Sequence, residues 1–385
     1  MRTGAVVMGT PLVSRRSLLK GAGTGVAGAL VLAGCGNAST AEPGDGGADA
    51  VTVKDQRGKE VTFPHPVRRV VTLPVPTAAM LIAADRSADH LVGMERRSWI
   101  AARDGILGEM FPRTRNLPHG VASKSFVPNV ESILGLNPDA VVQWADHGPG
   151  LITPMENAGL KVVGLDYGTQ HDLEVWIRLF AGMLGKPERG KAMLSRMHAD
   201  LTAVKKAAQK ARPPKPKIIY IFMAQGEVKV AGGQSYNDYY IKLIGARNPA
   251  SEGTGLTGSG AGVDIEQILA WDPDVVLLSN FDDATPDDLY GDKVWKGVSA
   301  VKSRRVYKIP LGGYRWDPPS HESPLMWRWL STVAFPEQDG IDLRAKIVDY
   351  YRFLYGYHPS DKQIDEILWM DLNAGSAAYE QFARR

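Results

Sequence analysis

The segment Val130–Val142, VESILGLNPDAVV, occurs a second time in altered form as IEQILAWDPDVVL at residues 265–277. The two copies are 135 residues apart. Arrays of structural repeats have shorter periods, of about 20 to 50 residues. A single pair at this spacing therefore predicts two similar lobes. Six of the thirteen positions are identical: Glu131/Glu266, Ile133/Ile268, Leu134/Leu269, Pro138/Pro273, Asp139/Asp274 and Val141/Val276.

Each copy has the pattern of a short helix followed by a buried strand. Apolar residues at 130, 133, 134 and 136, and at 265, 268, 269 and 271, fall on one face of a helix. Asn137 and Asp272 each precede a proline. A residue before proline is disfavoured in the helical conformation, so both helices should end there. The apolar runs that begin at Ala140 and Val275 then predict buried strands.

Short β-rich runs alternate with amphipathic segments over most of the chain after Val51. This alternation predicts βα units, and hence an α/β fold of two similar lobes with mostly parallel sheets. The predicted strands are residues 69–73, 90–94, 140–144, 162–166, 217–223, 275–279 and 306–309.

Residues 187–211, PERGKAMLSRMHADLTAVKKAAQKA, have the features of one long helix that joins the lobes. Proline stands at the start, no glycine follows Gly190, and the last turn is basic before Pro213. A helix of these 25 residues would extend about 37 Å. Such a strut would permit small movements of the lobes and disfavour wide closure.

The first 34 residues have the features of a secretory signal. The basic segment Ser14–Lys20, SRRSLLK, precedes an apolar run of small residues that is too short for a stable membrane span. The paired arginines resemble a twin-arginine signal, and Leu32–Cys35, LAGC, resembles a bacterial lipobox. An uncleaved amphipathic N-terminus is the alternative, and the general secretory route is also open.

Cys35 is the only cysteine in the chain, so it cannot form an internal disulfide. The resemblance to a lipobox implies that its sulfur carries a lipid. Residues 36–50, GNASTAEPGDGGADA, have no apolar face and are typical of a flexible tether. We therefore expect a body outside the cytoplasm, anchored to the cell membrane through Cys35.

The chain of 385 residues is long enough for two domains and additional segments. Its formal charge is +3, but four basic and no acidic residues lie in the first 34, so the remainder is nearly neutral. That balance gives no general attraction for nucleic acid. We divide the chain into a signal (1–34), a tether (35–50), a first lobe (51–186), the connecting helix (187–211), a second lobe (212–335) and a C-terminal helical extension (336–385), which we expect to pack against the second lobe.

These features together resemble the substrate-binding proteins of ABC importers for iron chelates, haem and cobalamin, the periplasmic binding proteins with a helical backbone. The similarity rests on the lipoprotein signal, the two lobes with one long helix, and the helix-Pro-Asp-strand sequence in each lobe. Residues 51–73, VTVKDQRGKEVTFPHPVRRVVTL, resemble the first strand region of the family. Residues 261–280, AGVDIEQILAWDPDVVLLSN, resemble its second-lobe signature.

The resemblance implies a monomeric lipoprotein that captures an iron–siderophore or related metal chelate between its lobes. It would deliver this ligand to an ABC permease dimer with its ATPase, and would need no cofactor and catalyse no reaction. Carriers of molybdate or tungstate, haem or cobalamin have the same fold and are alternatives. An exported hydrolase or oxidoreductase that uses the same cleft is the alternative from another class.

In this family, one glutamate on each lobe docks into arginine pockets of the permease dimer. The matching residues are Glu131 and Glu266. The alternative is that each glutamate only complements the dipole of its helix, since acidic residues are favourable in a first helical turn. The presence of a glutamate at the equivalent position in both lobes favours docking.

In open α/β sheets, ligands bind beyond the carboxyl ends of the strands. The cleft should thus be lined by residues 74–77, 95–99, 143–147 and 166–169 of the first lobe, and 223–225, 233–239, 280–282 and 311–317 of the second. Arginine offers a forked donor for carboxylate, hydroxamate or other oxyanion groups, and aromatic walls suit a planar or chelated ligand. Core packing is the alternative for each aromatic residue. The predicted ligand-binding residues are Arg97, Trp99, Trp144, Tyr236, Tyr239, Phe281, Tyr314, Arg315 and Trp316.

Coordination of a bare metal ion is not expected. The eight histidines show no close pair at ligand spacing, and no cysteine of the body could assist them. His147, His321 and Glu322 lie nearest to the predicted cleft. Two matches to Gly-x-Gly-x-x-Gly, at residues 23–28 and 253–258, do not join a predicted strand to a helix and are not interpreted as dinucleotide sites.

Overall fold

The computed structural model describes residues 49–384 except 124, 211–212, 225 and 338–341. The proposed signal sequence, Cys35 and most of the tether lie outside the described residues. Residues 46–385 form one structural unit. No helix among the described residues is both long enough and apolar enough to cross a membrane.

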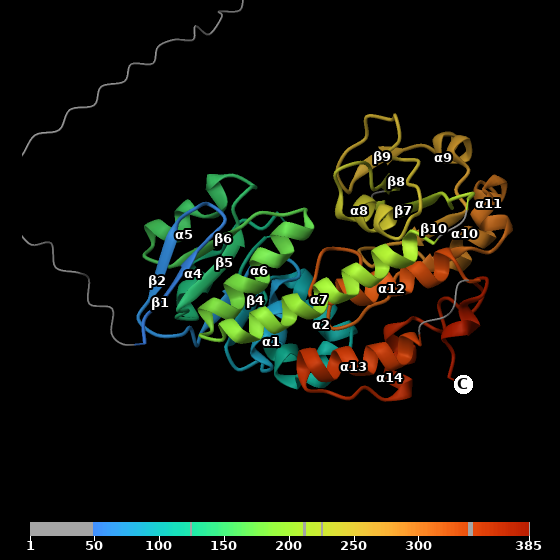
Figure 1. Cartoon of the computed structure of the whole chain (residues 1–385). Helices are drawn as coiled ribbons and strands as arrows, with labels where there is room; N and C mark the ends of the chain where they lie inside the picture. The colour runs from blue at the N-terminus through green and yellow to red at the C-terminus, as the bar shows by residue number, and fades with distance from the viewer. Residues whose placement is uncertain (1–48, 124, 211–212, 225, 338–341, 385) are drawn as a thin grey trace, which may run out of the picture. The chain divides into compact units, whose positions relative to one another are not determined.

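The first lobe is built on a fully parallel sheet (Figure 1). Its four strands lie in the order β4 (Leu91–Met94), β3 (Val70–Thr72), β5 (Ala140–Trp144) and β6 (Val162–Leu165), and an antiparallel hairpin of β1 (Val51–Lys54) and β2 (Glu60–Phe63) precedes them in the chain. The helices are α1 (Thr77–Asp85), α2 (Arg96–Asp104), α3 (Leu107–Met110), α4 (Val130–Gly135), α5 (Thr153–Asn157) and α6 (Gln170–Met183), with 3₁₀ turns η1 (Pro112–Asn116) and η2 (Pro149–Leu151).

The second lobe contains a mixed sheet of five strands. They lie in the order β11 (Val306–Lys308), β10 (Val275–Leu278), β7 (Ile218–Ala224), β8 (Glu227–Val230) and β9 (Ala261–Val263), of which the first three are parallel and β8 is antiparallel to both neighbours. The helices are α8 (Tyr236–Leu243), α9 (Ile265–Trp271), α10 (Pro286–Gly291), α11 (Ser299–Lys302) and α12 (Ser323–Ala334), with the 3₁₀ turn η3 (Trp295–Gly297).

All seven predicted strands are present, and the α/β class with mostly parallel sheets is confirmed. β8 and β9 were not among the predicted strands. β8 has the sequence EVKV and is only partly buried, so it lacks the apolar run that marks the parallel strands. β8 pairs with β7 in an antiparallel arrangement, and the sequence alone did not reveal this pairing.

α7 (Pro187–Ala208) is the long helix between the lobes. It packs on α6 of the first lobe and on α12 of the second. The helix has 22 residues and ends at Ala208, before the predicted end at residue 211. Figure 1 shows α7 and α12 running side by side.

The C-terminal extension consists of α13 (Leu343–Tyr355), α14 (Asp361–Ile367) and the 3₁₀ turn η4 (Tyr379–Phe382). α13 packs against α12 of the second lobe, as expected, but also against α1 of the first. Arg189 of α7 donates hydrogen bonds to the carbonyl oxygens of Phe353 (2.8 Å) and Leu354 (3.0 Å). The extension therefore holds both lobes.

The Pro-Asp part of the repeated motif makes the same contacts in each lobe. The backbone N–H of Asp139 donates to the carbonyl of Arg69, and that of Asp274 to the carbonyl of Lys217, both at 2.8 Å. The carboxylate of Asp139 accepts the backbone N–H groups of Arg68 (2.6 Å) and Arg69 (2.9 Å). That of Asp274 accepts the N–H of Lys217 at 2.7 Å. Each aspartate thus ties its strand to the start of the neighbouring one.

The ends of the two motif helices are also stabilised in the same way. The guanidinium of Arg69 donates to the carbonyl of Leu136 at 2.7 Å. The ammonium of Lys217 donates to the carbonyl of Trp271 at 2.6 Å. A cation at the C-terminus of a helix satisfies a free carbonyl and complements the helix dipole. The two copies of the motif are therefore similar in their hydrogen bonds as well as in sequence.

Two of the six identical positions, the glutamate and the leucine, face solvent in both copies. Ile133 and Ile268 are fully buried, whereas Leu134 is 45% and Leu269 is 39% exposed. Glu131 and Glu266 are exposed as well, and within the described residues neither forms an ion pair or a side-chain hydrogen bond. The fold explains the identical isoleucine, proline, aspartate and valine pairs, but not the glutamates and leucines.

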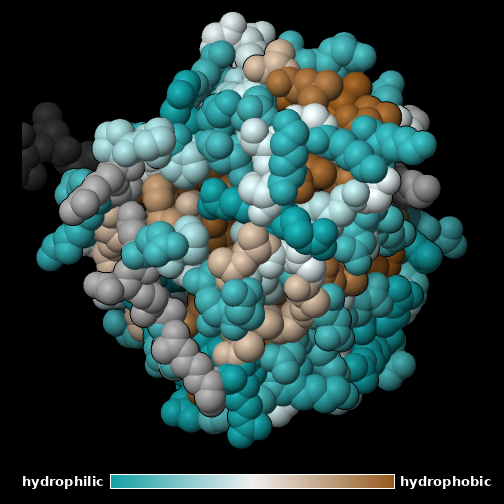
Figure 2. Space-filling view, turned by 90° about the vertical axis from the view of Figure 1, so that its right-hand side faces the viewer, coloured by the Kyte–Doolittle hydropathy of each residue, from teal (hydrophilic) through white to brown (hydrophobic). Residues whose placement is uncertain are grey.

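One hydrophobic core is continuous through both lobes. It includes Trp176 of the first lobe, Met197 of α7, Trp327 of the second lobe and Tyr351 of the extension. Two smaller cores cover the other faces of the sheets. The face in Figure 2 is mainly hydrophilic, with apolar side chains in small separate groups. A shared core favours a limited range of movement between the lobes.

Candidate functional site

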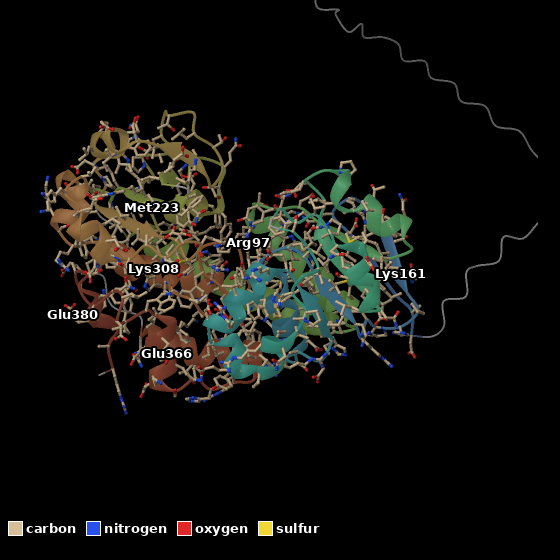
Figure 3. The ribbon with its side chains drawn as sticks, turned by 180° about the vertical axis from the view of Figure 1, so that it is seen from behind. Arg97, Lys161, Met223, Lys308, Glu366 and Glu380 are labelled. Carbon is tan, nitrogen blue, oxygen red and sulfur yellow. The ribbon has the colours of Figure 1, made fainter. Side chains whose placement is uncertain are left out.

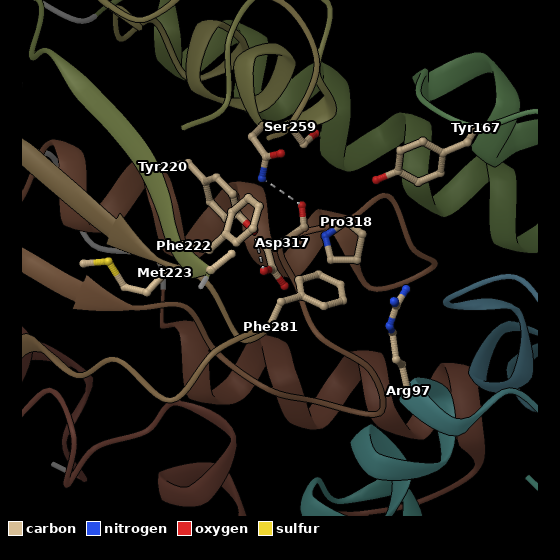
Figure 4. A pocket seen from close by; sticks show the side chains of 11 residues that line it. Arg97, Tyr167, Tyr220, Phe222, Met223, Ser259, Phe281, Asp317 and Pro318 are labelled. Carbon is tan, nitrogen blue, oxygen red and sulfur yellow. Dashed lines mark hydrogen bonds between the residues drawn. The ribbon is translucent and has the colours of Figure 1, made fainter. Parts of the chain in front are cut away.

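A cavity of about 360 Å³ lies between the lobes (Figure 4). Pockets of this size accommodate small organic ligands. The first lobe contributes Arg97 and Tyr167, and the second lobe contributes Tyr220, Phe222, Met223, Ala224, Asn237, Ser259, Phe281, Asp317 and Pro318. In Figure 4, Arg97 and Tyr167 stand on one side of the cavity and Phe281 and Asp317 on the other.

The cavity lies where the sheet geometry predicts it. Arg97 follows β4 and Tyr167 follows β6 in the first lobe. Phe281 follows β10 and Asp317 follows β11 in the second. The carboxyl ends of parallel strands meet at one edge, so residues distant in the chain converge there.

Arg97 is positioned by the start of α2. The buried carboxylate of Glu95 caps this helix and accepts the backbone N–H groups of Arg97 (2.7 Å) and Ser98 (3.3 Å). Burial raises the pKa of Glu95, although these hydrogen bonds act against the shift. The guanidinium of Arg97 lies 5.1 Å from the centre of the Phe126 ring. Figure 3 shows Arg97 where the two lobes meet.

Asp317 places a buried carboxylate in the opposite wall. Its side chain is 1% exposed, and Oδ2 accepts from the hydroxyls of Tyr220 (3.1 Å) and Ser279 (2.9 Å). Oδ1 has no hydrogen-bond partner among the described residues. Burial and the nearby Asp317 raise the pKa of Tyr220 far above its usual value, so this phenol remains a donor. The Oδ1 atom of Asp317 is itself buried.

A second cavity, of about 470 Å³, shares Arg97 and Phe281 with the first. Arg315 lines it and donates to the carbonyls of Asn280 (2.8 Å) and, across the lobes, Arg97 (3.2 Å). Its guanidinium lies 4.7 Å from the centre of the Phe281 ring. The extension contributes Trp369 and Leu372 to this cavity. The two cavities thus adjoin at Arg97 and Phe281.

Three of the nine predicted ligand residues lie in these cavities: Arg97 and Phe281 in both, and Arg315 in the second. Tyr239 is half-buried and lines a separate hollow beside α7. Trp99 stacks on His119, with ring centres 4.1 Å apart, and lines none of the described cavities.

The other four predicted residues, Trp144, Tyr236, Tyr314 and Trp316, are at most 2% exposed and line none of the described cavities. Trp144 packs against Trp176 at a ring-centre distance of 5.7 Å. The indole of Trp316 donates to Glu322 at 2.6 Å. Core packing, the alternative considered for aromatic residues, describes where these four lie.

The sequence prediction missed several residues of the cavity wall. Tyr167, Asn237 and Asp317 lie inside predicted loops but were not among the selected residues. Tyr220 and Phe222 lie on β7, within the predicted strand 217–223, and only loop residues and Trp144 were selected. The alternation of side chains along a strand could have indicated them, since residues 220, 222 and 224 share one face.

No group of three histidine, cysteine, aspartate or glutamate residues suited to a metal ion is found in the described part of the chain. His147 is exposed and contacts Asp146 at 2.7 Å. His321 is buried, and its Nε2 lies 2.6 Å from the hydroxyl of Tyr355. Burial lowers the pKa of His321 to about 3, which keeps the ring neutral.

Known proteins share this architecture. The sequence model described as periplasmic binding protein matches residues 124–311. A solved structure of a periplasmic solute binding protein from Veillonella parvula has 32% sequence identity and a TM-score of 0.77, over 85% of this chain and 99% of that one. The molybdate-binding protein MolA of Haemophilus influenzae is 24% identical over 336 residues, 80% of this chain and 92% of that protein. The iron(3+)-hydroxamate-binding protein FhuD of Bacillus subtilis is 25% identical over 313 residues, 76% of this chain and 91% of that protein.

Two α/β lobes around a cavity, joined by one long helix, define the class of substrate-binding proteins with a helical backbone. The chain belongs to the periplasmic binding protein family, whose members are the extracytoplasmic substrate-binding proteins of ABC transporters. The relatives reported above are binding proteins and not enzymes.

Proposed function

We propose that this protein captures an iron–siderophore or related metal chelate between its lobes and delivers it to an ABC permease. The observation that carries the proposal is the pair of adjoining cavities, of about 360 and 470 Å³, which share Arg97 and Phe281. Aromatic walls with one arginine suit a chelate whose organic ligand carries anionic oxygen groups. The binding of iron(3+) hydroxamate by a relative supports the same class.

The chemistry of the first cavity favours a chelate over a small oxyanion. Arg97 is the one basic side chain among its described lining residues. The buried carboxylate of Asp317 stands across from it and would repel a compact anion. A larger ligand can place an anionic group at Arg97 while its apolar parts contact Phe222 and Phe281.

A molybdate or tungstate carrier is the second candidate. It is favoured by the relative that binds molybdate and by the two arginines, Arg97 and Arg315, that line the second cavity. Haem and cobalamin remain alternatives within the same fold. A cleft enzyme is less well supported, because the relatives are binding proteins.

Ligand binding by the purified body, residues 49–385, tests this proposal. Tryptophan fluorescence would be followed while a ferric trihydroxamate, a ferric triscatecholate, molybdate, haem and cobalamin are added in turn. We expect saturable quenching by a ferric chelate and a weaker response in Arg97→Gln. Saturable binding of molybdate alone would establish the second candidate, and turnover of any bound compound would contradict a pure carrier.

Docking on the permease is the second part of the proposal. Glu131 and Glu266 are exposed and occupy the same position in the two lobes. Leu134 and Leu269 lie about one turn further along the same helices and are also exposed. Two equivalent pairs of an acidic and an apolar side chain suit a partner with two equivalent basic sites, such as a permease dimer.

The N-terminal part of the proposal rests on the sequence. We propose that residues 1–34 direct export, that Cys35 carries the lipid anchor, and that the protein acts as a monomer. Metabolic labelling with a radioactive fatty acid tests the anchor. Label should enter the wild-type protein and be absent from Cys35→Ser.

A further inference from the structure

The loop that carries Arg315 and Asp317 into the ligand site is held by a buried carboxylate. This loop, residues 311–317, is buried throughout. Glu322, at the start of α12, is 0% exposed. Its Oε1 accepts the backbone N–H of Gly313 at 3.0 Å, and its Oε2 accepts the indole N–H of Trp316 at 2.6 Å. Each oxygen thus holds one fixed donor of the loop.

The C-terminal extension supplies the other two donors to the same carboxylate. The hydroxyl of Tyr355 donates to Oε1, and that of Tyr351 donates to Oε2 at 3.3 Å. Tyr351 also accepts the N–H of Gly313 at 3.0 Å. Both tyrosines lie on α13, outside the region 124–311 that matches the family model. The extension therefore contacts the binding loop through Glu322.

Close packing around the carboxylate fixes the shape of the loop. A Cβ atom on Gly312 would lie 2.1 Å from Oε2 of Glu322, and one on Gly313 would lie 2.3 Å from the hydroxyl of Tyr355. Only glycine fits at these positions. A third tie comes from α14, whose residue Ile367 accepts the backbone N–H of Leu311 at 2.9 Å.

We infer that the C-terminal extension is part of the ligand-binding site, an inference that rests on the proposed function. Glu322, Tyr351 and Tyr355 act as positioning residues that hold the 311–317 loop. The extension also lines the second cavity directly through Trp369 and Leu372. It sets the position of Arg315 against Asn280 and Arg97, and that of Asp317 against Tyr220 and Ser279.

The groups that face Glu322 leave no place for an amide. Both oxygens accept an N–H that cannot reverse its role, so the amide nitrogen of Glu322→Gln would oppose either Gly313 or Trp316. The neighbouring titratable groups are Tyr351 and Tyr355, together with His321, whose Nε2 is 4.0 Å from Oε1. The pKa of His321 is lowered by burial and, to a smaller extent, by the positive charge of Arg189 on α7. Glutamine therefore preserves size but not function at this position.

The test compares Glu322→Gln with Tyr379→Phe, a control that removes one buried hydrogen-bonding group of the extension. The hydroxyl of the buried Tyr379 bonds to the carbonyl of Leu368 (2.6 Å) and not to the loop. Hydrogen exchange of the unliganded protein reports on the loop, and titration with a ferric trihydroxamate reports on binding. We expect faster exchange in 311–317 and an affinity weaker by about tenfold in Glu322→Gln only.

Each outcome decides one part of the inference. Normal exchange and an affinity within about twofold of the wild type in folded Glu322→Gln would overturn it. Faster exchange with unchanged affinity would overturn the role in binding. Faster exchange in a protein whose wild type binds no chelate would support the loop anchor and refute the proposed function instead. If Glu322→Gln does not fold, the double variant Tyr351→Phe/Tyr355→Phe replaces it. This variant keeps the hydrogen bonds from Gly313 and Trp316 to Glu322. A smaller loss of affinity with the same exchange pattern is expected.

Discussion

The two lobes share the contacts of the repeated motif and differ in what they contribute to the cavity between them. Their repeated motifs share the same aspartate and helix-end contacts, and both expose a glutamate and a leucine. At the cavity, however, the first lobe gives two lining residues and the second lobe gives nine. The second lobe alone has the mixed sheet and the loop tied to the extension. The shared contacts of the motif stabilise the fold, and we propose that the shared exposed side chains serve docking while the second lobe supplies most of the wall of the first cavity.

The largest expected effect is on transport by the double variant Glu131→Ala/Glu266→Ala. Both side chains are exposed and distant from the cavity wall, so ligand affinity should be unchanged. Uptake of the ligand in cells should be abolished if the permease needs both contacts. Normal uptake in the double variant would contradict the docking role. The two single variants would show whether the lobes contribute equally.

Ligand affinity should depend on side chains from both lobes. Arg97→Gln removes the one basic side chain of the first cavity and is expected to weaken chelate binding by about tenfold or more. Phe281→Ala, from the second lobe, removes part of the aromatic wall and should cost about fivefold. Fluorescence titration measures both. Trp99→Phe, outside the described cavities, serves as the control with little change.

The exposed leucines should affect docking without affecting the fold. Leu134→Ser and Leu269→Ser change side chains that are 45% and 39% exposed, so the free energy of unfolding should shift by no more than about 0.5 kcal/mol. Uptake should fall by about fivefold when an apolar contact with the partner is lost. Equal uptake by both variants and the wild type would limit the docking surface to the glutamates.

The aspartates of the motif should differ in their effect on stability. Asp139 accepts two backbone N–H groups and Asp274 accepts one. Replacement by alanine removes the hydrogen bonds that the charged carboxylate accepts, at an expected cost of about 2 kcal/mol in the first lobe and about 1 kcal/mol in the second. Urea denaturation measures the difference. A larger cost for Asp274→Ala would show that the second copy carries more of the fold.

The last expected effect, on the pH dependence of stability, concerns the second lobe and has no counterpart in the first. Burial raises the pKa of Glu322 from 4.5 to about 7, so its contribution to stability is fully present below 4.5 and is lost as the pH rises to about 7. The pKa of His321 is lowered from 6.5 to about 3, so its contribution is present above 6.5 and lost as the pH falls. Between 4.5 and 6.5 the two effects oppose each other.

His321→Asn should reveal the effect of Glu322. Its free energy of unfolding should fall relative to the wild type as the pH rises from 5 to 6.5, by up to about 1.4 kcal/mol per pH unit. Urea denaturation at several pH values provides the measurement. A slope for the variant equal to that of the wild type would show that His321 does not contribute to the pH dependence in this range, and a flat variant curve would show the same for Glu322.

Much of the fold could be predicted because it is encoded by neighbours in the chain. The helix-Pro-Asp-strand motif, the seven strands and the start of α7 follow from local periodicity and from the backbone limits of proline. β8 was missed since its apolar content is low and its order depends on β7. The exposure of Leu134 and Leu269 was also not expected, because their helical spacing is that of a buried face.

The ligand site was predictable only in position. The rule for parallel strands predicts a site at the carboxyl ends, where the cavities lie, and Arg97, Arg315 and Phe281 of the nine predicted ligand residues line these cavities. Trp144 and Trp316 have the same chemical character, but they are buried by contacts with residues far away in the chain, such as Trp176 and a glutamate on α12. No local pattern distinguishes an aromatic wall from an aromatic core.

The sequence by itself determined that the chain forms two similar α/β lobes with a helix between them, because repeats and periodicity are local properties. Only the tertiary structure decided which side chains line the cavity, and that the C-terminal extension holds both lobes and the binding loop. The physical reason is that burial and hydrogen-bond partners depend on segments brought together from the whole chain. Asp317, for example, is held by Tyr220 and Ser279, which lie 97 and 38 residues away in sequence.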